Sequence, residues 1–209
     1  MHRLLALMGL MASPLAAQDR AGEFDYYVIS LSWSANWCAL EGDTRNSPQC
    51  DPAADFGWIL HGLWPQYERG YPANCVSAER PPRRSATAAM ADIMCTSGLA
   101  WHQWRIHGVC TGLSSDDYYA LSREAYGRIT RPAVFRSLTK EVTLPAALIE
   151  EAFLKDNPTL APDVITISCM SGYIHEARIF MTRVLEFRDC GQDVIRDCAM
   201  TSAQFDPIR

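Results

Sequence analysis

Hydrophobic and polar residues alternate along Phe24–Trp33, a period-two pattern that predicts a strand with two different sides. One side of this strand carries Tyr27, Ile29 and Leu31, and the other carries Val28, Ser30 and Ser32. From residue 164 onward, three further segments are predicted to be strands: VITISC, YIHEARIFM and VLEFRDC. Strand-forming patterns therefore lie near both ends of the chain.

The middle of the chain has helical patterns instead. Helices are predicted over residues 86–95, with a break near Gly98, and then over 114–129 and 145–156. Ser114 is the expected N-cap of the second helix, and acidic residues follow in its first turn, where the helix dipole favours them. Helices placed between strands, without βαβ repetition, predict one α+β domain with an antiparallel central sheet and helices packed around it.

The first 17 residues have the three parts of a secretory signal peptide. His2 and Arg3 form a short basic start, Leu4–Met11 an apolar core, and Ser13–Ala17 a small-residue region at whose end we expect cleavage. The apolar run is too short to span a bilayer as a helix; the alternative is a buried N-terminal helix. We therefore expect an exported protein, periplasmic or secreted, whose mature domain covers residues 18–209.

Eight cysteines also indicate export. No two of them have the C-x-x-C spacing typical of metal sites, and their irregular spacing suits disulfides formed in an oxidising compartment. Spacing alone leaves their pairing open.

The charge balance bears on possible partners. The chain has 19 basic and 24 acidic residues and a net charge of −5; loss of Arg3 with the signal peptide leaves 18 against 24, or −6. Because Lys and Arg contacts to phosphate supply most non-specific affinity, this composition argues against a tight nucleic-acid binder. A nucleic acid bound by this chain would bind weakly, in a local cleft.

The stretch WHQWRIHGVCTG, residues 101–112, contains two histidines, two tryptophans, an arginine and a cysteine. On a helix, Gln103, Ile106 and His107 share a face. His102 and His107 are about 140° apart and are not natural co-ligands, and the H-E-x-x-H pattern of a zinc protease is missing. An imidazole and an amide on one face indicate catalysis or anion binding.

A second stretch, FGWILHGLWPQ, begins at Phe56 with strand character and is predicted to reach His61 and then turn at Gly62 and Pro65. A histidine beside a glycine that lets a ligand approach the backbone is a candidate acid or base. The alternative is a core histidine bonded to backbone. The recurrence of a tryptophan-flanked His-Gly pair at His107 favours the functional interpretation.

These stretches resemble, in order and separation, the two signature segments of the ribonuclease T2 family: FGWILHGLWPQ the first and WHQWRIHGVC the second. Residues 26–38, YYVISLSWSANWC, are similar to the first core strand of the family, and residues 165–190 to its late strands. The resemblance covers most of the chain after residue 22. It implies an endoribonuclease that cleaves single-stranded RNA without a metal or cofactor, and we expect it to be a monomer.

The resemblance also implies roles. RNA supplies the nucleophile, its 2′-hydroxyl, so the protein needs a base and an acid. His107 takes the position of the base and His61 that of the acid, which gives a 2′,3′-cyclic phosphate that is later hydrolysed with the roles reversed. His102 resembles a position that helps to hold phosphate. His175 matches no such position, and we expect a structural role for it.

Aromatic residues near the two stretches divide into two groups. Trp64 can stack on a base, with Tyr71 or Tyr67 nearby. For Trp101 and Trp104 core packing is the stronger interpretation.

Two positions depart from the family pattern. Gln103 stands where the family usually has Glu, and Ile106 where it usually has Lys. Gln103 can hydrogen-bond phosphate or an imidazole but carries no charge. Loss of one donor to the transition state can cost about 10²–10³ in rate; the long side chain of Arg105 is a candidate to compensate.

Disulfide pairs follow from the resemblance as well. It implies Cys75–Cys110 and Cys169–Cys198, with Cys38–Cys50 as a plausible local pair. Cys95–Cys190 then follows by elimination.

Two other classes of function stay open. The replacements at Gln103 and Ile106 favour a weakened or inactive relative that acts as an RNA- or protein-binding module. A metallohydrolase using His102 and His107 is the third class, and cleavage in excess chelator would exclude it.

Overall fold

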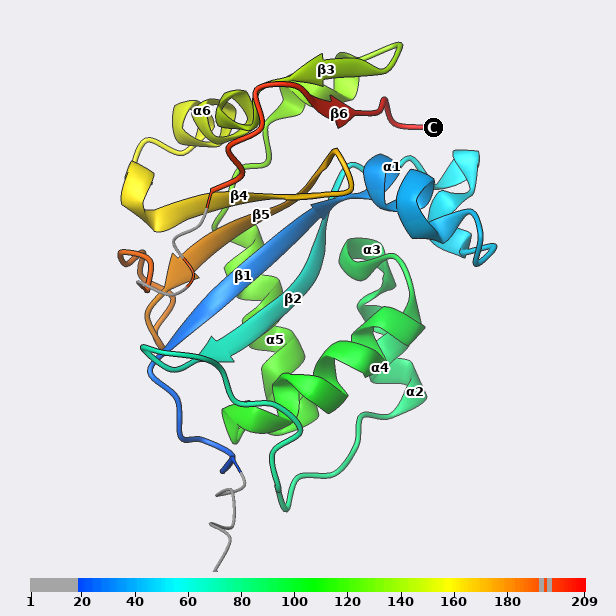
Figure 1. The fold of residues 1–209 in the computed structure, drawn as a ribbon. Coiled ribbons are helices and arrows are strands. Elements are labelled where there is room, and N and C mark those ends of the chain that lie inside the picture. Colours follow the sequence, from blue (N-terminus) through cyan, green and yellow to red (C-terminus); the bar gives the residue numbers. More distant parts are fainter. Residues whose placement is uncertain (1–18, 192–193, 195–196) are drawn as a thin grey trace, which may run out of the picture.

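The computed structural model describes residues 19–191, 194 and 197–209; the expected signal peptide, residues 1–17, lies outside them. In this part of the chain, one sheet contains six strands: β1 (Tyr26–Trp33), β2 (Trp58–Gln66), β3 (Val142–Leu144), β4 (Ile165–Met170), β5 (Tyr173–Met181) and β6 (Ala203–Phe205). Five of them lie in the order β2-β1-β5-β6-β3, and β4 also pairs with β5 (Figure 1). The pairs β1–β2, β1–β5, β4–β5 and β3–β6 are antiparallel, and β5 meets β6 in parallel at one position.

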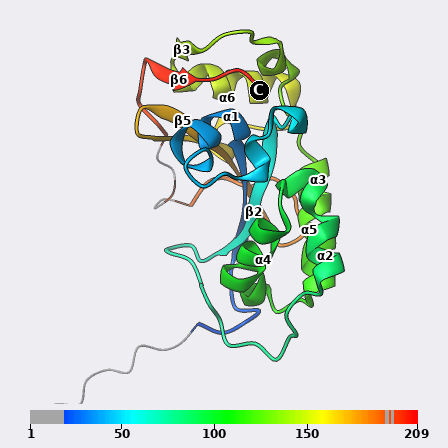
Figure 2. The ribbon, with the colours of Figure 1, turned by 90° about the vertical axis from the view of Figure 1, so that its right-hand side faces the viewer.

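The helices pack around this sheet. They are α1 (Ser34–Trp37), α2 (Arg84–Ala89), α3 (Ala91–Met94), α4 (Ser97–Ile106), α5 (Ser115–Gly127) and α6 (Ala146–Asp156). Helices α3, α4 and α5 pack against β2, and α6 packs against β4 at the other end of the molecule, near β3 and β6 (Figures 1 and 2). The predicted single α+β domain with an antiparallel central sheet is confirmed.

The alternation predicted for the first strand is present in β1. Tyr27, Ile29 and Leu31 belong to the large hydrophobic core under the helices. The opposite face carries Val28, which packs in a smaller cluster, and then the buried Ser30 and Ser32. This second face of the sheet is therefore polar near the middle of β1.

The middle helices also follow the prediction, with two differences. The helix predicted over residues 86–95 is divided at Met90 into α2 and α3, and one break is shifted. Ser114 caps α5, since its Oγ accepts the N–H of Asp117 at 3.2 Å. The break expected near Gly98 lies earlier, at Cys95, whose φ is 67°. Thr96 then caps α4 by accepting the N–H of Leu99, so Gly98 lies inside that helix.

Two strand predictions are wrong. The chain does not turn at Gly62 and Pro65, because β2 continues to Gln66. β2 is an edge strand, so the missing N–H of Pro65 need not cost a ladder bond. The segment VLEFRDC forms no strand; it contributes one bridge, Phe187 to Met181.

Three of the four expected disulfides are present: Cys38–Cys50, Cys75–Cys110 and Cys169–Cys198. The expected pair Cys95–Cys190 is not formed, and both thiols are free. Cys95 ends α3, which packs on β2, whereas the N–H of Cys190 donates to Asp163, just before β4. β1 and β5 lie between β2 and β4 in the sheet, and strands are spaced about 4.8 Å apart, so the two cysteines are beyond disulfide reach.

Across the described residues, every helix is too short or too polar to cross a lipid bilayer.

Candidate active site

His61 lies at a bulge in β2. Ser30 pairs with Gly62 and Leu31 pairs with Leu60, so His61 is an extra residue between them. A bulge redirects a side chain, and this one sets the imidazole on the polar face of the sheet. The His61 side chain is 31% exposed, and its Nδ1 lies 2.5 Å from Oε1 of Glu176.

Glu176 is a buried carboxylate in the middle of β5. Its side chain is 1% exposed, and its second oxygen, Oε2, accepts from both Nε and Nη2 of Arg178, at 2.8 and 2.6 Å. Burial alone would raise the pKa of Glu176. The hydrogen bond with His61 and the positive charges of His61 and Arg178 outweigh burial and hold that pKa well below its ordinary value.

His107 is the C-cap of α4, and its N–H donates to the carbonyl of Gln103 at 3.0 Å. The next residue, Gly108, is packed so tightly that a Cβ there would meet the rings of Trp104 and Tyr118. His107 is half-buried, and its Nδ1 is buried without a hydrogen-bond partner. Burial, followed by the neighbouring His61 and His102, lowers the pKa of His107 to about 4.

Trp64 lies between the two central histidines. The centroid of its ring is 5.3 Å from that of His61 and 5.3 Å from that of His107. Its Nε1 donates to Oε1 of Gln103 at 2.7 Å, and Gln103 is 2% exposed. A Cβ at Gly62 would collide with both of these atoms, so this glycine permits the contact between β2 and α4.

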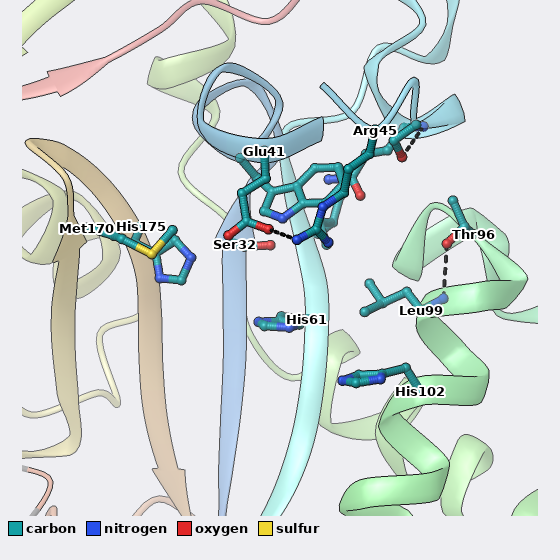
Figure 3. Close-up of a pocket in the computed structure, with 13 residues that line it drawn as sticks. Ser32, Glu41, Arg45, His61, Thr96, Leu99, His102, Met170 and His175 are labelled. Atoms are coloured by element: carbon teal, nitrogen blue, oxygen red, sulfur yellow. Dashed lines mark hydrogen bonds and ion pairs between the residues drawn. The ribbon is translucent and has the colours of Figure 1, made fainter. Parts of the chain in front are cut away.

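A cavity of about 390 Å³ opens on the other side of His61. Figure 3 shows His61 in its middle, with His102 from α4 on one side and His175 from β5 on the other. Glu41 and Arg45, which form an ion pair at 2.7 Å, close the end nearest α1. The wall combines polar and apolar side chains and has room for a ligand next to His61.

His102 is exposed in this wall. Its pKa lies below the ordinary value because of partial burial and then the charges of Arg105 and His61. Arg105 itself lines a separate groove beside Trp101 and Trp104. The structure therefore does not place the guanidinium of Arg105 in the cavity with His61.

The two tyrosines considered as stacking partners of Trp64 differ in surroundings. Tyr71 is 60% exposed in the long loop between β2 and α2. The hydroxyl of Tyr67 donates to Asp19 at 3.1 Å. Trp104 is buried in the core as expected, whereas Trp101 is 42% exposed.

Sequence reasoning missed Glu176 and Arg178 and assigned His175 a structural role. His175 lies at a second bulge, opposite Ser168 and Cys169, and its Nδ1 is 3.8 Å from Oε2 of Glu176. Burial lowers the pKa of His175 against the opposing charge of Glu176. The sequence did contain a signal: the charged residues of HEAR, positions 175–178, lie inside the otherwise apolar strand YIHEARIFM. Charged residues in a buried strand need partners, so these were candidates for a site.

Among the described residues, no three His, Cys, Asp or Glu side chains are grouped so that they could hold a metal ion. Of His102 and His107, only His102 lines the cavity beside His61.

Comparison with known proteins places this geometry in a family. Residues 24–190 match the sequence model of the Ribonuclease T2 family. A ribonuclease from Aeromonas hydrophila is 37% identical over 141 residues, which are 62% of this chain and 63% of that protein. The match thus spans less than two thirds of that relative's length.

Solved structures share the fold. An RNase-related protein from Calystegia sepium superposes with a TM-score of 0.66 at 18% identity, over 87% of this chain and 96% of that one. RNase NT in complex with 5′-AMP superposes with a TM-score of 0.64 at 19% identity, over 88% of this chain and 99% of that one. The matched segment contains both histidine stretches and the β5 carboxylate, and the chain belongs to the ribonuclease T2 family.

Proposed function

We propose that this protein is a metal-independent endoribonuclease that cleaves single-stranded RNA with His107 as base and His61 as acid. The observation that carries the proposal is the position of Trp64, whose ring lies 5.3 Å from each imidazole. Both histidines therefore border one small region. An acid and a base that act on the two sides of one phosphate must be close together in this way. Membership in the family and the ribonuclease among its relatives support RNA as the substrate.

The reaction requires no atom from the protein except protons. Neutral His107 takes the proton of the 2′-hydroxyl, whose oxygen attacks phosphorus. The bond from phosphorus to the 5′-oxygen breaks, and His61 gives that oxygen its proton. The products are a 2′,3′-cyclic phosphate and a free 5′-hydroxyl, and water then opens the cyclic phosphate with the two roles reversed.

The surroundings of the two imidazoles support this division. Burial lowers the pKa of His107 to about 4, so its ring is neutral at pH 6 and can accept a proton. The Nδ1 of His61, by contrast, faces a carboxylate, which favours a ring that carries a proton there. A neutral ring that can accept a proton, beside a ring whose Nδ1 faces a carboxylate, is an arrangement that suits an acid–base pair.

Three other residues complete the proposed site. His102, exposed in the cavity wall, contacts the phosphate, and Trp64 and Tyr71 supply surfaces on which bases stack. The role of Gln103 differs from the expected hydrogen bond to phosphate or an imidazole, because its side-chain oxygen accepts from Trp64 and the residue is buried. We therefore assign Gln103 to holding Trp64, with no part in proton transfer.

The test is cleavage of single-stranded RNA by the oxidised protein in excess chelator, from about pH 4 to pH 8. We expect cyclic-phosphate ends, and a loss of about 10²–10⁴ in rate for His61→Ala and for His107→Ala. Glu151→Ala, an exposed change on α6, is the control. Turnover that neither histidine variant lowers would overturn the proposal, and activity that chelator abolishes would point to a metal.

A non-catalytic RNA- or protein-binding module is the second candidate, and Ile106 is the observation that favours it. This half-buried apolar side chain stands next to His107, at the position where the resemblance leads us to expect a cation for the transition state. A folded wild type that binds RNA without cleaving it would make binding the function.

We further propose that the protein is exported after removal of residues 1–17 and acts as a monomer. The composition of the first 17 residues and the three disulfides support export. Both points are tested on protein purified from the compartment outside the cytoplasmic membrane. The mass of its chain tests the removal of residues 1–17, and the mass of the native protein in solution tests whether it is a monomer.

A further inference from the structure

Glu176 divides its two oxygens between two neighbours. Oε1 faces Nδ1 of His61 at 2.5 Å, and Oε2 accepts two hydrogen bonds from Arg178. The carboxylate is 1% exposed, so solvent does not compete for it. Its orientation is therefore fixed by the guanidinium on one side and presented to the imidazole on the other.

The sheet is built to hold this group. The residues opposite Glu176 are Ser32 on β1 and Ser168 on β4, two small side chains that leave room for it on the polar face. The bulge at His61 brings the imidazole across β1 to the carboxylate, although β2 and β5 are not neighbours in the sheet. A buried carboxylate is costly unless it is paired, and His61 and Arg178 are the partners of this one.

From this arrangement we infer that Glu176 is a positioning residue for His61, which fixes a proton on Nδ1 and leaves Nε2 to exchange protons with RNA. The inference rests on the proposed function for its catalytic meaning, but the position of the proton is a property of the folded protein alone. Arg178 is assigned a part as well: it sets which oxygen of Glu176 faces His61.

The chemistry of both steps needs this arrangement. In the cleavage step His61 is an imidazolium, and it gives the Nε2 proton to the 5′-oxygen while Nδ1 stays protonated against Glu176. The neutral ring that results has its lone pair on Nε2, which is the form that accepts a proton from water in the second step. One fixed hydrogen bond thus serves His61 as acid and then as base.

Other charged groups face His61 as well. His175 approaches from β5, His102 from α4 and His107 from the end of that helix. The positive charge of His61 contributes to the lowered pKa of each of these three histidines. Glu41 and Arg45 line the same cavity but form an ion pair with each other. Glu176 is the carboxylate that contacts the ring directly, so a change there is the most specific test.

Glu176→Gln has a predictable geometry. Because Arg178 donates twice to the Oε2 position, the amide oxygen of Gln must occupy it, and the amide NH₂ then faces Nδ1 of His61. An NH₂ group can only donate, so Nδ1 loses its proton and Nε2 gains one. The imidazolium form also loses its neighbouring negative charge.

For this variant we expect a rate loss of about 10²–10⁴ and an alkaline limb of the pH–rate profile that moves to lower pH. Glu151→Gln, the same change on the exposed face of α6, should leave the rate and the profile unchanged. Glu176→Gln combined with Arg178→Met frees the amide to turn, so the proton should return to Nδ1. A double variant with the proton still on Nε2 would overturn the part assigned to Arg178.

The deciding measurement is made on the wild type, so it does not depend on whether a variant folds. Nitrogen-15 spectra of the His61 ring at alkaline pH, assigned in the wild type by through-bond correlation to the His61 backbone, show which nitrogen carries the proton. We expect Nδ1. A proton on Nε2, or a Glu176→Gln variant with an unchanged tautomer and pH profile, would overturn the inference. A protonated Nδ1 in a protein that does not cleave RNA would retain the positioning and refute the proposed function alone.

Discussion

The Nε1 of Trp64 donates to Oε1 of Gln103 at 2.7 Å, and this bond joins β2 to α4 across the candidate site. His61 is on the first of these elements and His107 at the end of the second. The bond therefore controls the separation of the proposed acid and base. It is buried at the Gln103 end, where water cannot replace it.

Gly62→Ala should disrupt this contact between β2 and α4. The added methyl group would collide with Oε1 of Gln103 and Nε1 of Trp64, so the strand and helix must move apart. A displacement of about 1 Å can cost about 10² in rate, and we expect kcat/KM for RNA to fall by that order. Gly127→Ala at the end of α5 is the matched control, since nothing lies within 4 Å of its new Cβ. Equal activity of the two variants would contradict the role given to the hydrogen bond between Trp64 and Gln103.

Ile106→Lys should raise the rate of RNA cleavage. The residue next to His107 is half-buried at the end of α4, so a lysine there can extend its ammonium toward the charge that develops on phosphorus. Because removal of one such donor costs about 10²–10³, we expect its addition to give about tenfold or more in kcat. Leu148→Lys, the same change at an exposed position of α6, controls for net charge. An unchanged kcat would mean that another group already stabilises the transition state.

Local patterns predicted the parts of the fold whose causes are local. The alternation along β1 and the Ser114 cap of α5 are set by neighbours within a few residues, and both were predicted. Gly62 and Pro65 have the residue types of a turn, yet edge-strand pairing with β1 accommodates both. The strands β3 and β6, with three residues each, are too short to show a period.

The candidate site divides in the same way. His61 and His107 could be identified because each stands in a recognisable stretch of sequence. Glu176 is 115 positions from His61, and their contact depends on the strand order β2-β1-β5 and on a bulge. Neither feature is encoded in a short window. Elimination also failed for Cys95 and Cys190, since it assumed that every cysteine is paired.

The number of free thiols tests that correction. In denaturant without reductant, we expect two reactive thiols per chain, from Cys95 and Cys190, and none from the six paired cysteines. In the folded protein the reaction should be slow at neutral pH, because burial raises the pKa of the Cys95 thiol far above its ordinary range and that of Cys190 to about 12. Cys95→Ser should lower the count by one. A count of zero in the wild type would restore a fourth disulfide.

The stability of the fold should depend on His107 in a defined pH range. Burial lowers the pKa of this imidazole from 6.5 to about 4 in the folded protein. As pH falls through 6.5, the unfolded chain binds a proton here before the folded chain does, so the free energy of unfolding decreases. The decrease continues to about pH 4, below which both states are protonated.

A shift of this size corresponds to about 3 kcal/mol over that range. His107→Gln, which cannot titrate, should therefore lose about that much less stability between pH 6.5 and pH 4 than the wild type does. His102 and His175 also have lowered pKa values, but they are present in both proteins and cancel in the comparison. Denaturant unfolding with the disulfides intact gives the two curves. Parallel curves would mean that His107 is as easily protonated in the folded protein as in the unfolded one, and the neutral base assigned to it would then lose its physical support.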